Sequence, residues 1–306
     1  MLIAHINNPA GIASIISKYQ KEEGNKSEVY VFNNKIYKQF GGVKYNYSFP
    51  IDRWKFFRIL KEYDVWHYHY PYGSLKNRLE KQNNNKIYIK HYHGDDLRGK
   101  INEDYCLVST PDLLKYAPNG KWIPIPIDME EIILKRRDKQ KGLQQSKDTD
   151  LFVAHYPYYK QYPSNIRSFH DCYSNTLEKL QKEKRLKLVQ ILSIPHAEVL
   201  EIIQKCDIII GKIIPDVGWI GKFELEGMAL GKPVIAYVSN ELFEKYRPPV
   251  FRTTRNTFKK DLESLIEDVS ERERLSKEGP IYVAKYHSVD KIIKTIKCCY
   301  NDILNA

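Results

Sequence analysis

A segment that begins at Gly218 holds residue types whose spacing suits an anionic ligand. Gly218 and Gly221 allow the backbone to approach a ligand closely. A helix is expected to begin near Lys222, and the amides of Lys222 and Phe223 in its first turn are able to hold phosphate oxygens. Glu226 follows one turn later, where its carboxylate can accept hydrogen bonds from ribose hydroxyls. The segment therefore predicts a site for a nucleotide diphosphate.

The same segment has a simpler interpretation as an ordinary helix-to-strand unit with a surface glutamate. Leu225, Met228 and Ala229 recur at helical spacing and are expected to pack on a sheet. Gly231 would end this helix, and a strand would follow at Val234–Val238. This interpretation leaves Gly218 and Gly221 unexplained, which favours the ligand site.

The bulk composition narrows the class of protein. The chain has 306 residues, which fits two domains of about 130–170 residues. Its formal net charge of +11 favours anionic partners such as nucleotides, nucleic acid or an acidic membrane face, although a solvated lysine-rich surface explains the charge equally well. We find no apolar run of the ~18–20 residues that span a membrane and no signal-peptide pattern, so we expect a cytoplasmic protein, attached at most peripherally to the inner membrane face.

Cysteine usage agrees with a reducing compartment. The five cysteines are scattered, with no CxxC pair and no histidine–cysteine spacing that suits zinc.

Short apolar runs alternate with helical patterns along the chain, which predicts an α/β fold built on parallel sheets. The predicted strands are Leu2–Ile6, Val29–Phe32, Val65–Tyr68, Ile87–His91, Cys106–Ser109, Trp122–Ile125, Leu151–His155, Leu188–Leu192 and Asp207–Gly211. A polar stretch from Arg136 to Asp150 lies near the expected domain boundary, and Leu262–Lys277 and Val289–Leu304 are predicted helices. The pattern indicates two Rossmann-like lobes facing each other.

The segment GWIGKFELEGMALGKPVIAY resembles the donor-site motif of retaining glycosyltransferases of family 4, which have the GT-B fold. That motif has two glutamates with seven residues between them. Glu226 matches the second glutamate, which in the family binds the donor ribose. The first glutamate falls on Gly218, so its role at the donor sugar has no counterpart here. Glu224 is no substitute, because two residues along a helix rotate a side chain by roughly 200°.

Further matches follow in the family's order. They are Asn7–Gly11 (a glycine loop near the diphosphate and acceptor), Tyr63–His69, His93–Gly99 (like H-G-x-D-x-R), Ser109–Leu114 with Ile123–Asp128, and Ala284–Ser288. Together with the element pattern, the resemblance implies an acceptor lobe at residues 1–130, a nucleotide-sugar donor lobe at 131–288, and a C-terminal helix at 289–306 that packs back towards the first lobe.

The resemblance also implies cations at the donor diphosphate. The family has an arginine after the first strand of the second lobe and a lysine in a following K-G, and this chain has neither. Lys160 is the best candidate for this role, Arg167 the second, and His155 a possible hydrogen-bond donor. Gly11 joins them as a donor-side residue, because it lies in the stretch that resembles the glycine loop.

His93 closes a predicted strand and precedes a glycine, so it is expected at the lobe interface, where it can hydrogen-bond the donor sugar or the acceptor. A structural histidine with satisfied nitrogens is equally compatible with this position. Asp95 and Arg98 are expected to shape the acceptor side. The pair Asp95-Asp96 lacks the context of an Asp-x-Asp metal site, and the resemblance implies no metal and no cofactor besides the nucleotide-sugar substrate.

The predicted function is that of a retaining glycosyltransferase of hexosyltransferase type, which moves a sugar from a nucleotide-sugar to a glycan, lipid-linked or protein-linked acceptor hydroxyl. His93, Lys160 and Glu226 are the candidate catalytic residues, with Lys160 stabilising the departing diphosphate. One alternative is a non-catalytic nucleotide-sugar-binding homologue, which Gly218 favours. A basic nucleic-acid-binding protein is the other, although the chain has no recognisable module for that role.

Overall fold

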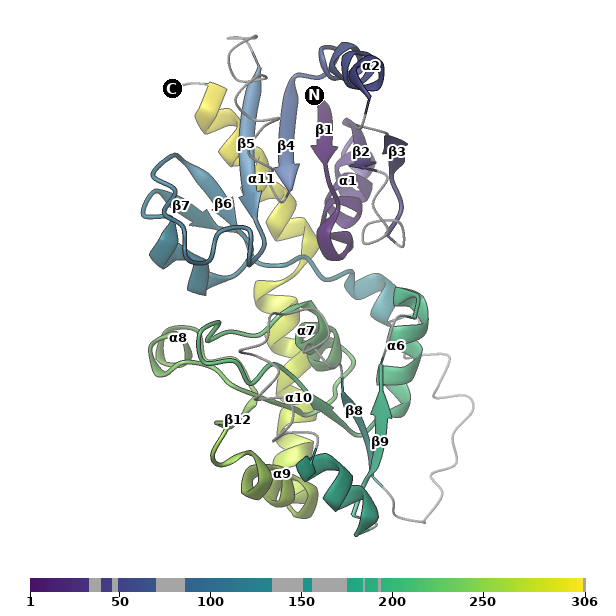
Figure 1. Cartoon of the computed structure of the whole chain (residues 1–306), viewed down its shortest axis with the longest axis vertical. Coiled ribbons are helices and arrows are strands. Elements are labelled where there is room, and N and C mark those ends of the chain that lie inside the picture. Colours follow the sequence, from purple (N-terminus) through teal and green to yellow (C-terminus); the bar gives the residue numbers. More distant parts are fainter. Residues whose placement is uncertain are drawn as a thin grey trace. The chain divides into compact units, whose positions relative to one another are not determined.

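The computed structural model describes residues 1–32, 40–45, 49–69, 86–133, 151–155, 175–183, 185–191 and 194–304. The chain divides into two compact units, of which unit 1 comprises Met1–Pro126 with His287–Ala306 and unit 2 comprises Ile127–Tyr286. The last helix, α11 (Val289–Leu304), therefore returns to unit 1, where Figure 1 shows it in yellow beside β4 and β5. This confirms the prediction that the C-terminal helix packs on the first unit.

Unit 1 is built on a seven-stranded sheet with the order β3-β2-β1-β4-β5-β6-β7. Every neighbouring pair of strands is parallel. The strands are β1 (Leu2–Ile6), β2 (Lys26–Phe32), β3 (Val43–Tyr45), β4 (Val65–His69), β5 (Ile87–Tyr92), β6 (Cys106–Val108) and β7 (Gly120–Trp122). Helices α1 (Ile12–Glu22) and α2 (Pro50–Leu60) accompany them. The chain runs from β1 to one side and from β4 to the other, so the switch point of this sheet lies between β1 and β4.

Unit 2 has a five-stranded parallel sheet with the order β12-β11-β10-β8-β9, and its switch point lies between β8 and β10. The strands are β8 (Phe152–His155), β9 (Lys187–Gln190), β10 (Ile208–Ile210), β11 (Val234–Ala236) and β12 (Phe251–Arg252). Its helices include α6 (His196–Lys205), α7 (Lys222–Ala229), α8 (Asn240–Tyr246), α9 (Phe258–Glu267) and α10 (Val269–Tyr286), and residues 129–133 and 175–182 are also helical. Two parallel α/β sheets confirm the predicted fold class.

Helix α7 is held between the sheet and α10. Leu225, Met228 and Ala229 are fully buried, as their spacing predicts. Gly279 of α10 lies against the C-terminal part of α7, and a Cβ added there would be 2.8 Å from the Met228 carbonyl oxygen. A side chain at this position would push the two helices apart, so Gly279 sets their close approach. This packing fixes where the first turn of α7 lies relative to the strands.

Most predicted strand ends shift by one to three residues in the structure, and two predicted elements differ in a way that has a clear physical reason. The stretch Leu262–Lys277 is not one helix, because the chain breaks between α9 and α10 at Asp268. The Asp268 carboxylate accepts hydrogen bonds from the Ser270 hydroxyl and the Glu271 amide and so begins a new helix. Strand β7 ends at Trp122 and does not continue to Ile125, since Pro124 cannot donate a ladder hydrogen bond. Among the described residues, no helix has the length and apolar character to cross a membrane.

Candidate functional site

The loop after β10 and the first turn of α7 are joined by a buried carboxylate. Glu224 is fully buried; its Oε1 accepts a hydrogen bond from the Lys212 amide (2.7 Å) and its Oε2 one from the Gly221 amide (2.9 Å). Gly211 gives this side chain its room, because a Cβ there would lie 2.5 Å from Glu224 Cγ. Glu224 therefore holds the loop to the helix. That it does not replace the missing motif glutamate stays a prediction.

Glu226 is a second buried carboxylate on the same helix. Its Oε1 lies 2.7 Å from His196 Nε2 and 3.4 Å from Lys222 Nζ. Burial by itself raises the pKa of Glu226, but Lys222 and His196 outweigh this effect and hold the pKa below its ordinary value. Glu226 is therefore a charged carboxylate at neutral pH, and a carboxylate can only accept hydrogen bonds.

Two cationic or polar side chains at this site were missed by sequence reasoning. His196 begins α6, and only the fold brings it to Glu226, which is 30 residues away in the chain. Lys212 follows β10, and a Cβ added at Gly221 would lie 2.5 Å from Lys212 Nζ, so this ammonium lies over the loop that leads into α7. No periodicity or motif marks either residue. Lys212 places a positive charge beside a helix N-terminus, which favours anions.

The structure places the other predicted donor-side residues of unit 2 as follows. Gly218 has a left-handed φ of +67°, and its carbonyl oxygen accepts a hydrogen bond from the Ser239 amide, so a tight turn explains this glycine. Phe223 is buried in the first turn of α7. His155 is buried at the carboxyl end of β8, paired in register with Ile210 of β10. Lys160 and Arg167 lie outside the described residues.

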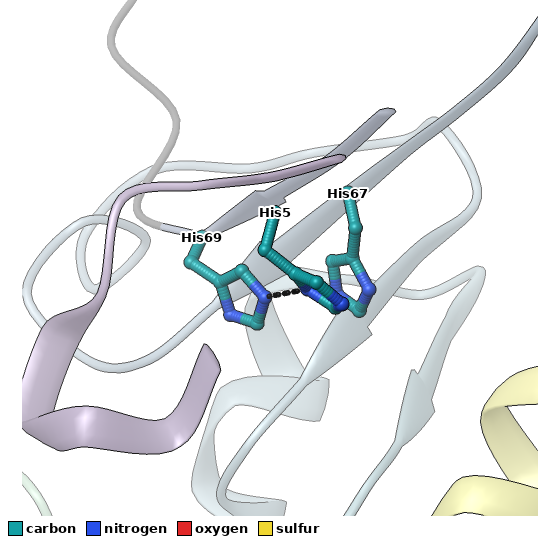
Figure 2. A group of neighbouring side chains, drawn as sticks. All are labelled: His5, His67 and His69. Atoms are coloured by element: carbon teal, nitrogen blue, oxygen red, sulfur yellow. Dashed lines mark hydrogen bonds between the residues drawn. The ribbon is translucent and has the colours of Figure 1, made fainter. Parts of the chain in front are cut away.

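Unit 1 carries a different group of polar residues at its own switch point. His5 of β1 pairs in register with His67 of β4, and His69 of β4 pairs with His91 of β5. Alternate residues of a strand point to the same face, so these four imidazoles share one side of the sheet and His93 follows at the end of β5. Figure 2 shows three of them, His5, His67 and His69, with their rings gathered together.

These five histidines belong to a closed ring of hydrogen bonds, which we call the histidine ring. Its members are His5, His69, His93, Ser109, His91, His67, Tyr300 and Gln20, in the order in which they are bonded. The distances between bonded atoms run from 2.6 Å, between Ser109 Oγ and His93 Nδ1, to 3.4 Å, between Gln20 Nε2 and Tyr300 Oη. Gln20 comes from α1 and Tyr300 from α11, so the ring connects both helices to the sheet.

One hydrogen can be assigned to every contact of the histidine ring while all five imidazoles remain neutral. Gln20 Oε1 accepts from the Ser27 hydroxyl and can only accept, so His5 donates to it from Nε2. His5 Nδ1 then accepts from His69 Nε2, and the same direction continues around the ring to the hydroxyl of Tyr300. Each contact receives one hydrogen, so an added proton would set two N–H groups against each other at a contact between two histidines, or an N–H against an O–H at Ser109 or Tyr300.

Burial keeps these imidazoles neutral. It is the largest cause that lowers their pKa values, to about 4 for His5, to about 3 for His93 and well below the ordinary value for the other three. Both imidazole nitrogens of His93 are hydrogen-bonded within the histidine ring, Nε2 to His69 and Nδ1 to Ser109. A substrate contact by the His93 side chain therefore requires the exchange of one of these hydrogen bonds.

The turn after β5 is held by ion pairs and carboxylate contacts. Asp96 accepts hydrogen bonds from the amides of His93 and Gly94, and burial raises its pKa to about 6. Arg98 donates from Nε and Nη2 to Asp112 (3.0 and 2.8 Å) and from Nη1 to Asp95 (3.1 Å). Asp95 and Arg98 are thus brought together by an ion pair, and their role towards an acceptor stays a prediction.

Gly11 precedes α1 with a left-handed φ of +74°, and a Cβ there would lie 2.8 Å from Phe40 Cδ1. Only glycine therefore fits both this backbone conformation and the space beside Phe40. A role of Gly11 at the donor stays a prediction.

No family model and no curated protein matches this sequence. Solved structures do match over its whole length. A glycosyltransferase from Rickettsia africae has 12% identity over 99% of this chain and 98% of its own, with a TM-score of 0.60. A sucrose-phosphate synthase from Thermosynechococcus elongatus has 14% identity over 100% and 99%, with a TM-score of 0.64. A UDP-GlcNAc 2-epimerase from Neisseria meningitidis, bound to UDP-GlcNAc, has 13% identity over 98% and 99%, with a TM-score of 0.58.

These likenesses establish the fold. The chain has the two Rossmann-like units of GT-B proteins, which confirms the resemblance to GT-B glycosyltransferases at the level of structure. At identities of 12–14% they do not assign an activity.

Proposed function

We propose that this protein is a glycosyltransferase that takes a sugar from a nucleotide-sugar and transfers it, with retention at the anomeric carbon, to an acceptor hydroxyl. The observation that carries the proposal is the charged, buried Glu226 on α7, one turn after a helix start over which Lys212 lies. The Glu226 carboxylate offers acceptors for ribose hydroxyls, and the amides of the helix start together with Lys212 offer donors for a diphosphate. Among the similar structures, the epimerase was solved with UDP-GlcNAc bound, which supports a nucleotide-sugar as the ligand.

In the proposed reaction, the protein stabilises the nucleoside diphosphate as it leaves the sugar. The first-turn amides of α7 at Lys222 and Phe223, together with Lys212, act on the developing negative charge, and Lys160 and Arg167 are proposed to add to them. Glu226 binds the ribose and orients the donor. The acceptor hydroxyl attacks the anomeric carbon as the bond to the diphosphate breaks, and the departing diphosphate oxygen takes the proton of that hydroxyl. The transfer is proposed to need no metal and no further cofactor.

Two residue groups complete this proposal. Gly11, Gly218, Gly221 and His155 contribute to the donor side, and His93, Asp95 and Arg98 to the acceptor side. Since both nitrogens of His93 lie in the histidine ring, its contribution is the placement of the turn after β5 unless a substrate displaces one of its partners.

A nucleotide-binding screen tests the proposal. The full chain is titrated with nucleoside diphosphates and nucleotide-sugars while its melting temperature is recorded. We expect one base to raise the melting temperature and Glu226→Ala to weaken binding at least tenfold. Glu198→Ala, which removes an exposed carboxylate of α6, is the matched control and is expected to bind normally. No shift with any nucleotide, or a shift that Glu226→Ala leaves intact, contradicts the proposed site.

Turnover separates a transferase from the non-catalytic homologue that Gly218 suggests. Release of the nucleoside diphosphate from the donor, measured in the presence of EDTA and candidate acceptors, is expected to exceed the rate without protein. The anomeric configuration of the product, read by NMR, tests retention. Donor binding without release would favour the non-catalytic alternative. A salt-dependent complex with DNA or RNA, without nucleotide binding, would instead favour the nucleic-acid alternative.

We also propose that unit 1 docks on an anionic membrane, at the cytoplasmic face, through α2. Phe49, Ile51 and Trp54 are 63%, 67% and 62% exposed, and Lys55 and Arg58 are exposed beside them. A helix that presents aromatic and aliphatic side chains together with lysine and arginine suits the interface of an anionic bilayer.

Vesicle sedimentation tests this contact. The wild-type protein is expected to sediment with vesicles rich in phosphatidylserine at low salt, and Trp54→Ala to sediment several-fold less. Ile281→Ala removes an equally exposed side chain from unit 2 (67%) and serves as the control. Equal sedimentation of all three proteins would exclude α2 as the contact.

A further inference from the structure

We propose that three members of the histidine ring, His69, His91 and His93, bind one divalent transition-metal ion. Each offers a ring nitrogen, and these atoms all lie within 4.8 Å of one another. His69 Nδ1 and His93 Nε2 are 3.0 Å apart, whereas two nitrogens on one tetrahedral zinc ion with bonds of about 2.0–2.1 Å are separated by about 3.3 Å. A small rotation of the two rings would therefore admit an ion between them. Neutral imidazole is the ligand that zinc, copper and nickel share.

The second nitrogen of each proposed ligand already has a partner that would hold the ring in place. His69 Nε2 lies 2.9 Å from His5 Nδ1. Ser109 Oγ contacts two ligands at once, His93 Nδ1 at 2.6 Å and His91 Nε2 at 3.1 Å. Metal-binding histidines depend on such outer partners for their orientation. An ion would replace the hydrogen bonds His69–His93 and His91–His67, so His67 Nε2 would lose His91 as its acceptor. His93, bound through Nε2, would carry its hydrogen on Nδ1 and donate it to Ser109 Oγ, which reverses the direction of that contact.

Charge favours these three residues over the other candidate set, which consists of His5, His67 and His69 (Figure 2). A dication in a neutral interior is costly unless a negative charge or water compensates it. Asp96 accepts hydrogen bonds from the backbone amide of His93, so a carboxylate lies beside the proposed ligands. His93 is also partly exposed, which gives an ion its way in and lets water complete the coordination. The set in Figure 2 is fully buried.

The proposed ion would connect the carboxyl ends of β4 and β5 at the switch point of unit 1. It would act on the stability and order of this edge of the sheet, because a ligand that binds only the folded state stabilises it. This inference does not depend on the donor site of unit 2, and the transfer reaction there is proposed to need no metal. The two proposals therefore fail or succeed separately.

Titration of the chelator-treated full chain with Zn²⁺ alone tests the proposal. Calorimetry is expected to give one ion per chain, and the melting temperature to rise with added zinc. His93→Ala and His91→Ala are each expected to weaken binding at least tenfold, whereas His196→Ala, a partly exposed histidine of unit 2, is expected to leave zinc affinity unchanged. Absence of zinc binding by the wild type, or affinity that His93→Ala does not change, would overturn the proposal.

X-ray absorption at the zinc edge provides a second test that needs no variant. Three imidazole scatterers per zinc are expected. Sulfur in the first shell, which would place the ion on cysteine, or fewer than three imidazoles would also overturn the proposal. If an alanine variant fails to fold, as circular dichroism would show, the absorption spectrum of the wild type decides.

Discussion

The same position in two related sheets carries opposite kinds of polar chemistry. Between β1 and β4, unit 1 has the histidine ring, whose imidazoles are neutral and bonded to one another. Beside β10, unit 2 has two buried carboxylates on α7 with Lys212, Lys222 and His196 around them. A neutral network of imidazoles that hydrogen-bond to one another resists protonation, whereas a charged cluster at a helix start attracts ligands of the opposite sign.

Lowering the pH should produce the largest difference in stability between the two units. The histidines of unit 1 have folded pKa values below 6.5, so below pH 6.5 the unfolded chain binds protons that the folded chain excludes. The free energy of unfolding of unit 1 then falls with pH, by about 1.4 kcal/mol per pH unit for each such proton. This loss continues down to about pH 4 for His5 and about pH 3 for His93. The folded pKa of Glu226 is lowered, so its contribution to the free energy of unfolding is present above pH 4.5 and is lost only as the pH falls below that value.

Hydrogen exchange at pH 7, 6 and 5, in the presence of a chelator and corrected for intrinsic exchange rates, measures this difference. Amides of β4 and β5 are expected to lose protection before those of β10 and β11. Equal loss in both units would contradict the account of the histidine ring as a neutral network.

Removal of the Glu224 side chain should give the next largest effect. Glu224→Ala leaves the amides of Gly221 and Lys212 without this acceptor, which is expected to lower the free energy of unfolding of unit 2 by about 2–4 kcal/mol. Glu224→Gln keeps one acceptor oxygen and should cost less. Urea denaturation measures both, and Glu198→Ala on exposed α6 is the control, expected within about 0.5 kcal/mol of wild type. An equal cost for alanine and glutamine would point to packing as the cause.

Removal of the Tyr300 hydroxyl, which breaks the closed network of hydrogen bonds at one point, should lower the free energy of unfolding by less than Glu224→Ala does. Tyr300→Phe removes the group that contacts His67 Nδ1 at 2.7 Å, and we expect a loss of about 1–2 kcal/mol. Tyr286→Phe, at a partly exposed tyrosine of α10, is the matched control. Thermal and urea unfolding compare the two variants. If Tyr300→Phe is as stable as the control, the ring does not act as one closed network.

The smallest effect is expected at the charged cluster of unit 2. His196→Ala removes one of the two groups that lower the pKa of Glu226, so this pKa should rise while Lys222 continues to pair with the carboxylate. The cost in stability should be about 1 kcal/mol or less, because His196 is partly exposed. NMR titration of the Glu226 carboxyl carbon measures the shift. An unchanged pKa would mean that His196 only packs against Glu226.

Long elements could be predicted from the sequence because burial leaves a regular pattern. Strands such as Leu2–Ile6 are covered on both faces and are therefore mostly apolar, with His5 as the exception in this strand, and α11 shows helical spacing over its full length. Short elements such as β3 and α8 were missed, since three to seven residues are too few to show a period. The break at Asp268 was missed because its capping contacts depend on the local backbone and not on hydrophobic spacing.

The residues of the candidate site fall into two groups, those that the sequence pattern identifies and those that only the fold brings to the site. Glu226, Gly221 and Lys222 lie in one continuous segment, so order along the chain was enough to find them. His196 and Lys212 reach that segment from α6 and from the end of β10, and no local pattern connects them to it.

The two α/β units and the helix that carries Glu226 follow from the order of residues, because hydrophobic spacing and glycine positions are local properties of the chain. Which carboxylate is structural and which is paired with His196 depends on the folded arrangement of α6 and α7. The folded arrangement also joins five histidines and Ser109 to Gln20 and Tyr300, which are 280 residues apart, in one closed network of hydrogen bonds. The physical reason is that strand register and helix packing bring distant residues within hydrogen-bonding distance, and burial then determines their charge.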